Sequence, residues 1–141
     1  MKYVLLVSHG EFANGLKNAL FMLSGKREDV LSAGLMDGLS ADEFATVFEE
    51  IIKPIQENDE VIVLADIIGG SPLTTALNVL STKGLDHQAT VIGGMNLPLA
   101  LTTVLMKDNL SSDVLVQTVL SEAQGALKQF ELVNDDDEED V

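Results

Sequence analysis

Two short runs of uncharged, apolar residues constrain the fold of this chain more than any other feature of its sequence. They span residues 3–7 (YVLLV) and 61–65 (VIVLA). Runs of this length that are rich in β-branched residues are typical of strands covered on both faces, as in parallel sheets. His9 lies just past the end of the first run, and Asp66 directly follows the second. Because open parallel sheets bind ligands at the carboxyl ends of their strands, these two residues are candidate site residues.

Strand-like runs and helical spacings alternate along the rest of the chain. Further strands are predicted at 30–34 and 89–92, and helices at 14–24, 41–54, 71–83, 97–106 and 112–128. This order predicts an α/β fold, an open, mostly parallel, doubly wound sheet of four parallel strands with helices on both faces. A last short run, Phe130–Val133, is expected to form an antiparallel edge strand that two subunits exchange.

The helix starts carry recognisable capping signals. Ser40 and Glu43 have the spacing of a capping box, which places a helix start at Ala41. Ser71 followed by Pro72 is expected to act as N-cap with proline at the first helical position. Pro98 marks the start of another helix in the same way.

The composition excludes several classes of partner. The 141 residues carry a net charge of −15, which disfavours binding to nucleic acid or to anionic lipid. No apolar run approaches the ~20 residues of a membrane-spanning helix, so no direct membrane insertion is expected. The absence of cysteine fits a cytoplasmic location. Residues 1–133 are expected to form one domain, and the acidic residues 134–141 a solvated, disordered tail.

A histidine beside an aspartate is a combination suited to nucleophilic catalysis. If Asp66 accepts one ring N–H of His9, it fixes the tautomer and turns the other ring nitrogen outward. The carboxylate also stabilises the positive ring that forms when that nitrogen bonds to an electrophile. Two plainer interpretations stay open at this point. A lone histidine is often a structural or surface residue, and Asp66 can instead cap the turn that follows it.

Gly69, Gly70 and Ser71 have the outline of a phosphate-binding turn. Glycines let backbone N–H groups approach an anion closely, and a helix N-terminus behind them adds a favourable dipole. The alternative is that Gly69 and Gly70 form only a tight turn between strand and helix. The sequence has no P-loop and no obvious Mg²⁺-ligand cluster, so no cofactor, no metal and no nucleotide donor are expected. A phosphoryl group on His9 is therefore expected to come from another phosphoprotein.

Three motifs together resemble the mannose-family enzyme IIA component of the bacterial phosphoenolpyruvate-dependent sugar phosphotransferase system. They are Ser8-His9-Gly10, Asp66-x-x-Gly69-Gly70-Ser71-Pro72 and Gly94-x-Asn96-Leu97-Pro98. The resemblance covers residues 1–133. It implies that His9 accepts a phosphoryl group from phospho-HPr, as a tele-phosphohistidine on the nitrogen turned away from Asp66. The group then passes to a histidine of the IIB component, which phosphorylates the sugar entering through the membrane proteins IIC and IID.

The same resemblance implies roles for the neighbouring residues. Asp66 orients His9, Ser71 and the adjacent backbone N–H groups hold the phosphoryl oxygens, and the protein is a homodimer with exchanged terminal strands. Ile67 and Ile68 depart from the family pattern, in which a polar residue and an aromatic one are expected. An apolar rim around the site is expected to form the partner surface. Its residues are Phe12, Ile67, Ile68 and Leu97.

Rival functions use the same kind of histidine. The nearest is a phosphoryl carrier that serves a phosphotransferase-dependent dihydroxyacetone kinase, which differs only in its acceptor. A histidine phosphatase also places His-Gly after its first strand, but it needs arginines to clamp phosphate, and Arg27 is the only arginine here. A ligand-binding regulator of flavodoxin type would leave His9 unmodified.

Overall fold

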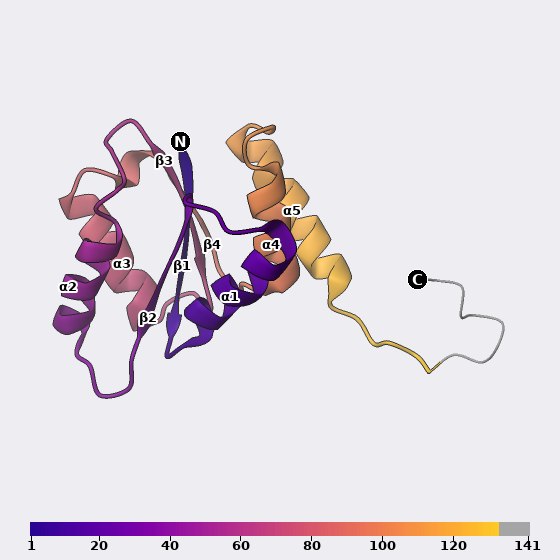
Figure 1. Ribbon diagram of the computed structural model, residues 1–141, viewed down its shortest axis with the longest axis horizontal. Helices are drawn as coiled ribbons and strands as arrows, with labels where there is room; N and C mark the ends of the chain where they lie inside the picture. The colour runs from indigo at the N-terminus through magenta and orange to yellow at the C-terminus, as the bar shows by residue number, and fades with distance from the viewer. Residues whose placement is uncertain (133–141) are drawn as a thin grey trace.

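The computed structural model describes residues 1–132 and contains one parallel sheet with strand order β2-β1-β3-β4. The strands are β1 (Lys2–His9), β2 (Val30–Leu35), β3 (Glu60–Ala65) and β4 (Ala89–Ile92). The helices are α1 (Phe12–Ser24), α2 (Ala41–Ile51), α3 (Ser71–Thr82), α4 (Leu97–Met106) and α5 (Ser112–Ala126), with a 3-10 helix at Asp86–Gln88. Figure 1 shows α2 and α3 on one face of the sheet and α1, α4 and α5 on the other. The predicted doubly wound α/β fold is confirmed.

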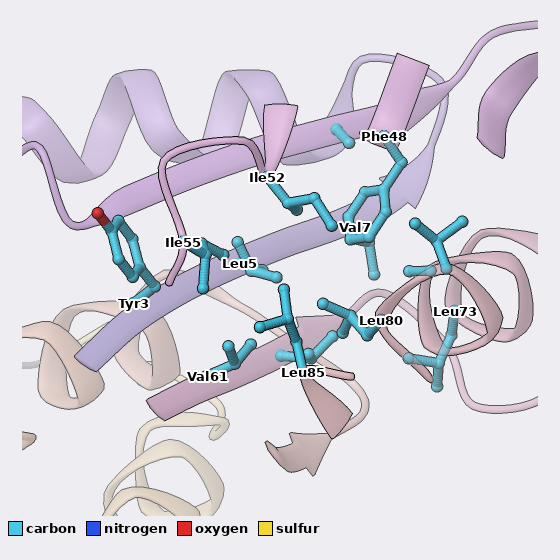
Figure 2. Close-up of a cluster of buried hydrophobic side chains, with 14 of the residues drawn as sticks. Tyr3, Leu5, Val7, Phe48, Ile52, Ile55, Val61, Leu73, Leu80 and Leu85 are labelled. Atoms are coloured by element: carbon cyan, nitrogen blue, oxygen red, sulfur yellow. The ribbon is translucent and has the colours of Figure 1, made fainter. Parts of the chain in front are cut away.

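The side chains of the central strand β1 belong to both layers of the hydrophobic core. Tyr3, Leu5 and Val7 point toward α2 and α3, where they meet buried side chains that include Phe48 and Leu80 (Figure 2). The alternate residues of the strand join a second cluster with α1, α4 and α5. Because successive side chains of a strand point to opposite faces, a strand covered on both sides must be apolar throughout. This explains why residues 3–7 contain no charge.

The register of the sheet places the ends of β1 and β3 next to each other. Val7 lies opposite Ala65, so His9 and Asp66 leave the sheet from neighbouring strands at the same edge. On the other side of β1, His9 lies opposite Leu35 at the end of β2. The carboxyl ends of three strands therefore converge around the histidine.

The capping signals of α2 and α4 are present, but Pro72 and Pro98 are each the second residue of their helix rather than the predicted first. The capping box of Ser40 and Glu43 is present, and Asn96 caps α4 by accepting a hydrogen bond from the Leu99 N–H at 2.8 Å. The prediction that Ser71 is an N-cap is wrong, because Gly70 takes that position and Ser71 is the first helical residue. Gly70 already has the extended backbone of a cap, so the helix begins one residue earlier than predicted.

The predicted C-terminal edge strand is not confirmed. Residues 127–132 follow α5 without regular secondary structure, and Figure 1 shows them leading away from the helix. Their side chains are exposed throughout. Residues 127–132 pair with none of the four strands of the sheet, whose order is β2-β1-β3-β4. Val133 and the acidic segment 134–141 lie outside the described residues. Among residues 1–132, none of the helices is both long and apolar enough to cross a membrane.

Candidate active site

His9 and Asp66 form a hydrogen-bonded pair at the carboxyl edge of the sheet. Oδ2 of Asp66 lies 2.8 Å from the ring Nδ1 of His9 and also accepts the backbone N–H of His9 at 2.9 Å. The His9 side chain is 49% exposed and that of Asp66 only 15%. The carboxylate therefore lies beneath a ring that is open to solvent. When Nδ1 carries the proton and donates it to Asp66, Nε2 keeps its lone pair.

Backbone hydrogen bonds fix the position of the aspartate. Its N–H donates to the Val7 carbonyl at 3.2 Å, and its carbonyl accepts the Gly94 N–H at 3.2 Å. Its second carboxylate oxygen, Oδ1, accepts the N–H of Ile67 at 2.8 Å. One oxygen of Asp66 is therefore hydrogen-bonded to His9, and the other to the first N–H group of the following turn.

The turn from β3 to α3 brings a helix N-terminus against the imidazole. Gly69 has a φ of 87°, a left-handed conformation that glycine adopts without strain. Gly70 is in contact with the ring, since a Cβ atom at this position would lie 2.9 Å from Cε1 of His9. Ser71 is exposed at the first position of α3, and its hydroxyl makes no hydrogen bond to the described residues. Three predicted site elements, the histidine, the aspartate and the glycine turn, therefore lie together.

Comparison with known proteins identifies the family. The model of the family described as PTS system fructose IIA component, EIIA-man, matches residues 3–120. This chain belongs to that family. It is an EIIA component of a sugar phosphotransferase system, and EIIA proteins are phosphotransfer components.

Relatives match this EIIA chain over nearly its whole length. The fructose-specific EIIA component of Bacillus subtilis strain 168 is 24% identical over 144 residues, which cover 97% of each chain. The PTS IIA protein associated with the fucose utilization operon of Streptococcus pneumoniae is 29% identical and superposes with a TM-score of 0.75, covering 91% of this chain and 92% of that one. The mannose/sorbose-specific IIA subunit of Enterococcus faecalis shares the fold, with 24% identity, a TM-score of 0.78 and coverage of 95% and 98%.

The charge of Asp66 is maintained by its hydrogen bonds. Partial burial raises the pKa of this carboxyl, but the hydrogen bonds from the backbone N–H and ring of His9 and from the Ile67 N–H outweigh it. The net result is a pKa below the ordinary value, so the carboxylate of the EIIA chain is ionised at neutral pH. A negative charge is thereby held next to the imidazole of His9.

The predicted apolar rim is only partly a surface feature of the EIIA chain. Phe12, Ile67 and Ile68 are 51%, 53% and 77% exposed. Leu97 is only partly exposed and packs against the core cluster beneath α1, α4 and α5. On the β2 side of His9, the loop of residues 35–39 lines an open pocket of about 300 Å³. The ring of His9 therefore lies between an apolar rim and an open pocket.

Two residues that support the site were not singled out from the sequence. Ser8 is fully buried, and its Oγ accepts the N–H of Ala13 at 2.7 Å, which ties the turn after β1 to the start of α1. Gly34 lies so close to the backbone of Gly10 that a Cβ atom there would collide with the Gly10 carbonyl. Ser8 lies three residues before the N-cap of α1, Glu11, so the usual capping position does not reveal its role. The contact between Gly34 and Gly10 joins segments that are distant in the sequence, so no local sequence pattern indicates it.

Proposed function

We propose that this EIIA component accepts a phosphoryl group from phospho-HPr on Nε2 of His9 and passes it to a histidine of the IIB component. The observation that carries the proposal is the pairing of Nδ1 with Asp66 at 2.8 Å in a ring that is half exposed. This pairing leaves Nε2 as the nucleophile and leaves it open to a partner protein.

The reaction needs only groups that the two proteins supply. The Nε2 lone pair attacks phosphorus, the nitrogen–phosphorus bond of the donor histidine breaks, and the proton stays on Nδ1. The ring then bears positive charge beside the ionised Asp66. The same steps in reverse, with the IIB histidine as nucleophile, return the free imidazole. Positioning and charge stabilisation, rather than acid or base chemistry, carry such a transfer.

We assign the phosphoryl oxygens to the turn of Gly69, Gly70 and Ser71. The first N–H groups of a helix have no intrahelical partner, and the helix dipole favours an anion at this end. The free hydroxyl of Ser71 adds a further donor. The contact between Gly70 and the ring supports this assignment, because a group bonded to Nε2 lies near the start of α3.

The partner surface proposed for HPr and IIB is the rim of Phe12, Ile67 and Ile68, with Leu97 at its base. Large apolar side chains exposed around a reactive group are typical of transient protein interfaces. Both partners must reach the same nitrogen, so we propose that they use this surface in turn. IIC and IID act later, in the membrane, and do not contact His9.

We further propose a cytoplasmic homodimer in which residues 130–133 pair with the partner subunit. Leu127, Phe130 and Leu132 are 84%, 82% and 95% exposed, and β4 has no strand beyond it among residues 1–132. An unpaired edge and an exposed apolar terminal segment complement each other. Residues 1–133 would then form the folded unit, with 134–141 as its acidic tail.

Phosphorylation by the purified donor proteins tests the function. The protein is incubated with phosphoenolpyruvate, enzyme I and HPr, and we expect an acid-labile, base-stable phosphoryl group. The chain has two histidines, so His9→Ala must lose the label and His87→Ala must keep it. Label that survives His9→Ala overturns the assignment. Adding IIB or the dihydroxyacetone kinase subunits to the labelled protein then identifies the acceptor.

A further inference from the structure

The backbone conformation of Gly70 does not require glycine. Its φ of −87° and ψ of 163° describe extended backbone that any residue adopts. Gly69, next to it, has a φ of 87° and needs glycine for its conformation. Something other than backbone geometry must therefore account for the missing side chain at position 70.

The space that a side chain at position 70 would need is filled by His9 and Ile67. A Cβ atom would lie 2.9 Å from Cε1 of the His9 ring and 3.3 and 3.4 Å from Cγ1 and Cδ1 of Ile67. Separations below 3.0 Å are not tolerated, so the ring would have to move. Such a movement strains the hydrogen bond between Nδ1 and Asp66, which is 2.8 Å long.

We propose that Gly70 is a positioning residue that sets the plane of the His9 imidazole by leaving room for Cε1. The ring lies between the carboxylate of Asp66, which holds Nδ1, and the bare Cα of Gly70. A methyl group at position 70 displaces the ring by a few tenths of an ångström and so weakens its hydrogen bond to Asp66. The catalytic consequence rests on the function proposed above.

A displaced ring is a poorer phosphoryl acceptor for two reasons. With a weaker bond to the carboxylate, Nδ1–H is less favoured, so a larger share of the neutral rings carries the proton on Nε2 and lacks the lone pair. The remaining rings present Nε2 at a changed angle to the phosphorus. A misplacement of about 1 Å can cost on the order of 10²-fold in rate, so the smaller shift expected here should cost about tenfold.

The proposal is tested with Gly70→Ala and three measurements. Nitrogen-15 NMR of the neutral His9 ring is expected to show mainly the Nδ1–H tautomer in the unmodified protein and a loss of that preference in the variant. Phosphoryl transfer from phospho-HPr is expected to fall by about tenfold. Circular dichroism is expected to show an unchanged fold.

Two glycine variants serve as matched controls. A Cβ at position 69 meets nothing within 4 Å, so Gly69→Ala is expected to lower the melting temperature through its φ and to leave the tautomer of His9 unchanged. Gly15→Ala, in helix α1, also points into open space and is expected to leave both tautomer and transfer rate unchanged. Only the variant at position 70 should move the ring.

The outcomes separate this inference from the proposed function. An unchanged tautomer in folded Gly70→Ala overturns the positioning role. If that variant does not fold, the unmodified protein decides, because the contact requires a nuclear Overhauser effect between the His9 Hε1 proton and the Gly70 Hα protons. Absence of that signal also overturns the role. Failure of the unmodified protein to accept phosphate refutes the proposed function instead, whatever the tautomer shows.

Discussion

Oδ2 of Asp66 accepts two hydrogen bonds from the same residue, His9, one from the backbone N–H at 2.9 Å and one from the ring Nδ1 at 2.8 Å. The first bond fixes the main chain at the end of β1, and the second fixes the ring on it. One carboxylate oxygen thus holds both the backbone of His9 and the orientation of its ring. The geometry resembles the aspartate–histidine pairs of hydrolases, in which the carboxylate fixes the tautomer and stabilises the charged ring.

Asp66→Asn is expected to slow phosphoryl transfer by at least ~10²-fold, because the ring loses its charged partner. Both oxygens of Asp66 accept N–H groups, so an amide NH₂ in either place faces a donor. We therefore also expect a loss of about 1–3 kcal/mol in unfolding free energy. Single-turnover transfer from phospho-HPr and urea unfolding measure the two effects. An unchanged transfer rate would reduce Asp66 to a structural role.

Ser71→Ala is expected to lower the transfer rate by about tenfold and to leave stability unchanged. Its hydroxyl does not cap α3, since Gly70 is the N-cap and no side-chain hydrogen bond is made there. Removing it therefore costs no folding energy, but it removes one donor to the phosphoryl oxygens, a charge-assisted bond worth about 1.5–3 kcal/mol. Thermal unfolding and transfer kinetics separate the two quantities. Equal rates for variant and unmodified protein would exclude the hydroxyl from the site.

The alternation of apolar runs and helical spacings was sufficient to predict the sheet, its four parallel strands and the helices around it. The pairing of His9 with Asp66 was predictable because strand ends of a parallel sheet meet at one edge. The N-cap at Gly70 was not, because it depends on the conformation of a turn rather than on the preference of Ser71 for caps. The strand predicted at Phe130–Val133 is not confirmed, because a strand depends on a neighbour to pair with, which no local pattern encodes.

Gly34→Ala is expected to destabilise the fold by about 3 kcal/mol, at the upper end for overpacking. The added Cβ would collide with the carbonyl oxygen of Gly10, which is backbone and cannot rotate away. Gly10 also donates its N–H to the Leu35 carbonyl at 2.7 Å, so the strain reaches the turn after His9. The urea midpoint measures the effect. Gly15→Ala is the control, and it should raise stability slightly because alanine favours a helix.

We expect Asp29 to make the stability of the fold depend on pH in the acidic range. The hydrogen bonds from Arg27, aided by Lys107 and opposed by burial, lower the pKa of this carboxyl from 3.8 to about 2. A depressed pKa stabilises the fold above pH 3.8, and this contribution is lost as the pH falls toward 2. Its size is about 2 kcal/mol.

Asp29→Asn tests this dependence. The variant should lose the part of the stability change between pH 4 and pH 2 that Asp29 contributes. It should also be less stable at pH 7 by about 2 kcal/mol, since Lys107, only 1% exposed, loses one ionised partner and keeps Asp108. Asp29 precedes β2, at the opposite end of the strand from Leu35 and His9, so phosphoryl transfer should be unaffected. An identical acid profile in the variant would contradict the assignment.

The terminal segment provides a test of the proposed dimer. If Phe130 and Leu132 pack on a partner subunit, replacing both with serine removes two large apolar side chains from the interface, each worth about 1.5–3 kcal/mol of burial. We expect the unmodified protein to have the mass of two chains by light scattering and the double variant to dissociate on dilution. Met22→Ser is the control, since Met22 is 83% exposed at the end of α1 and should leave the mass unchanged. A double variant that remains as dimeric as the unmodified protein would show that the segment does not hold the subunits together.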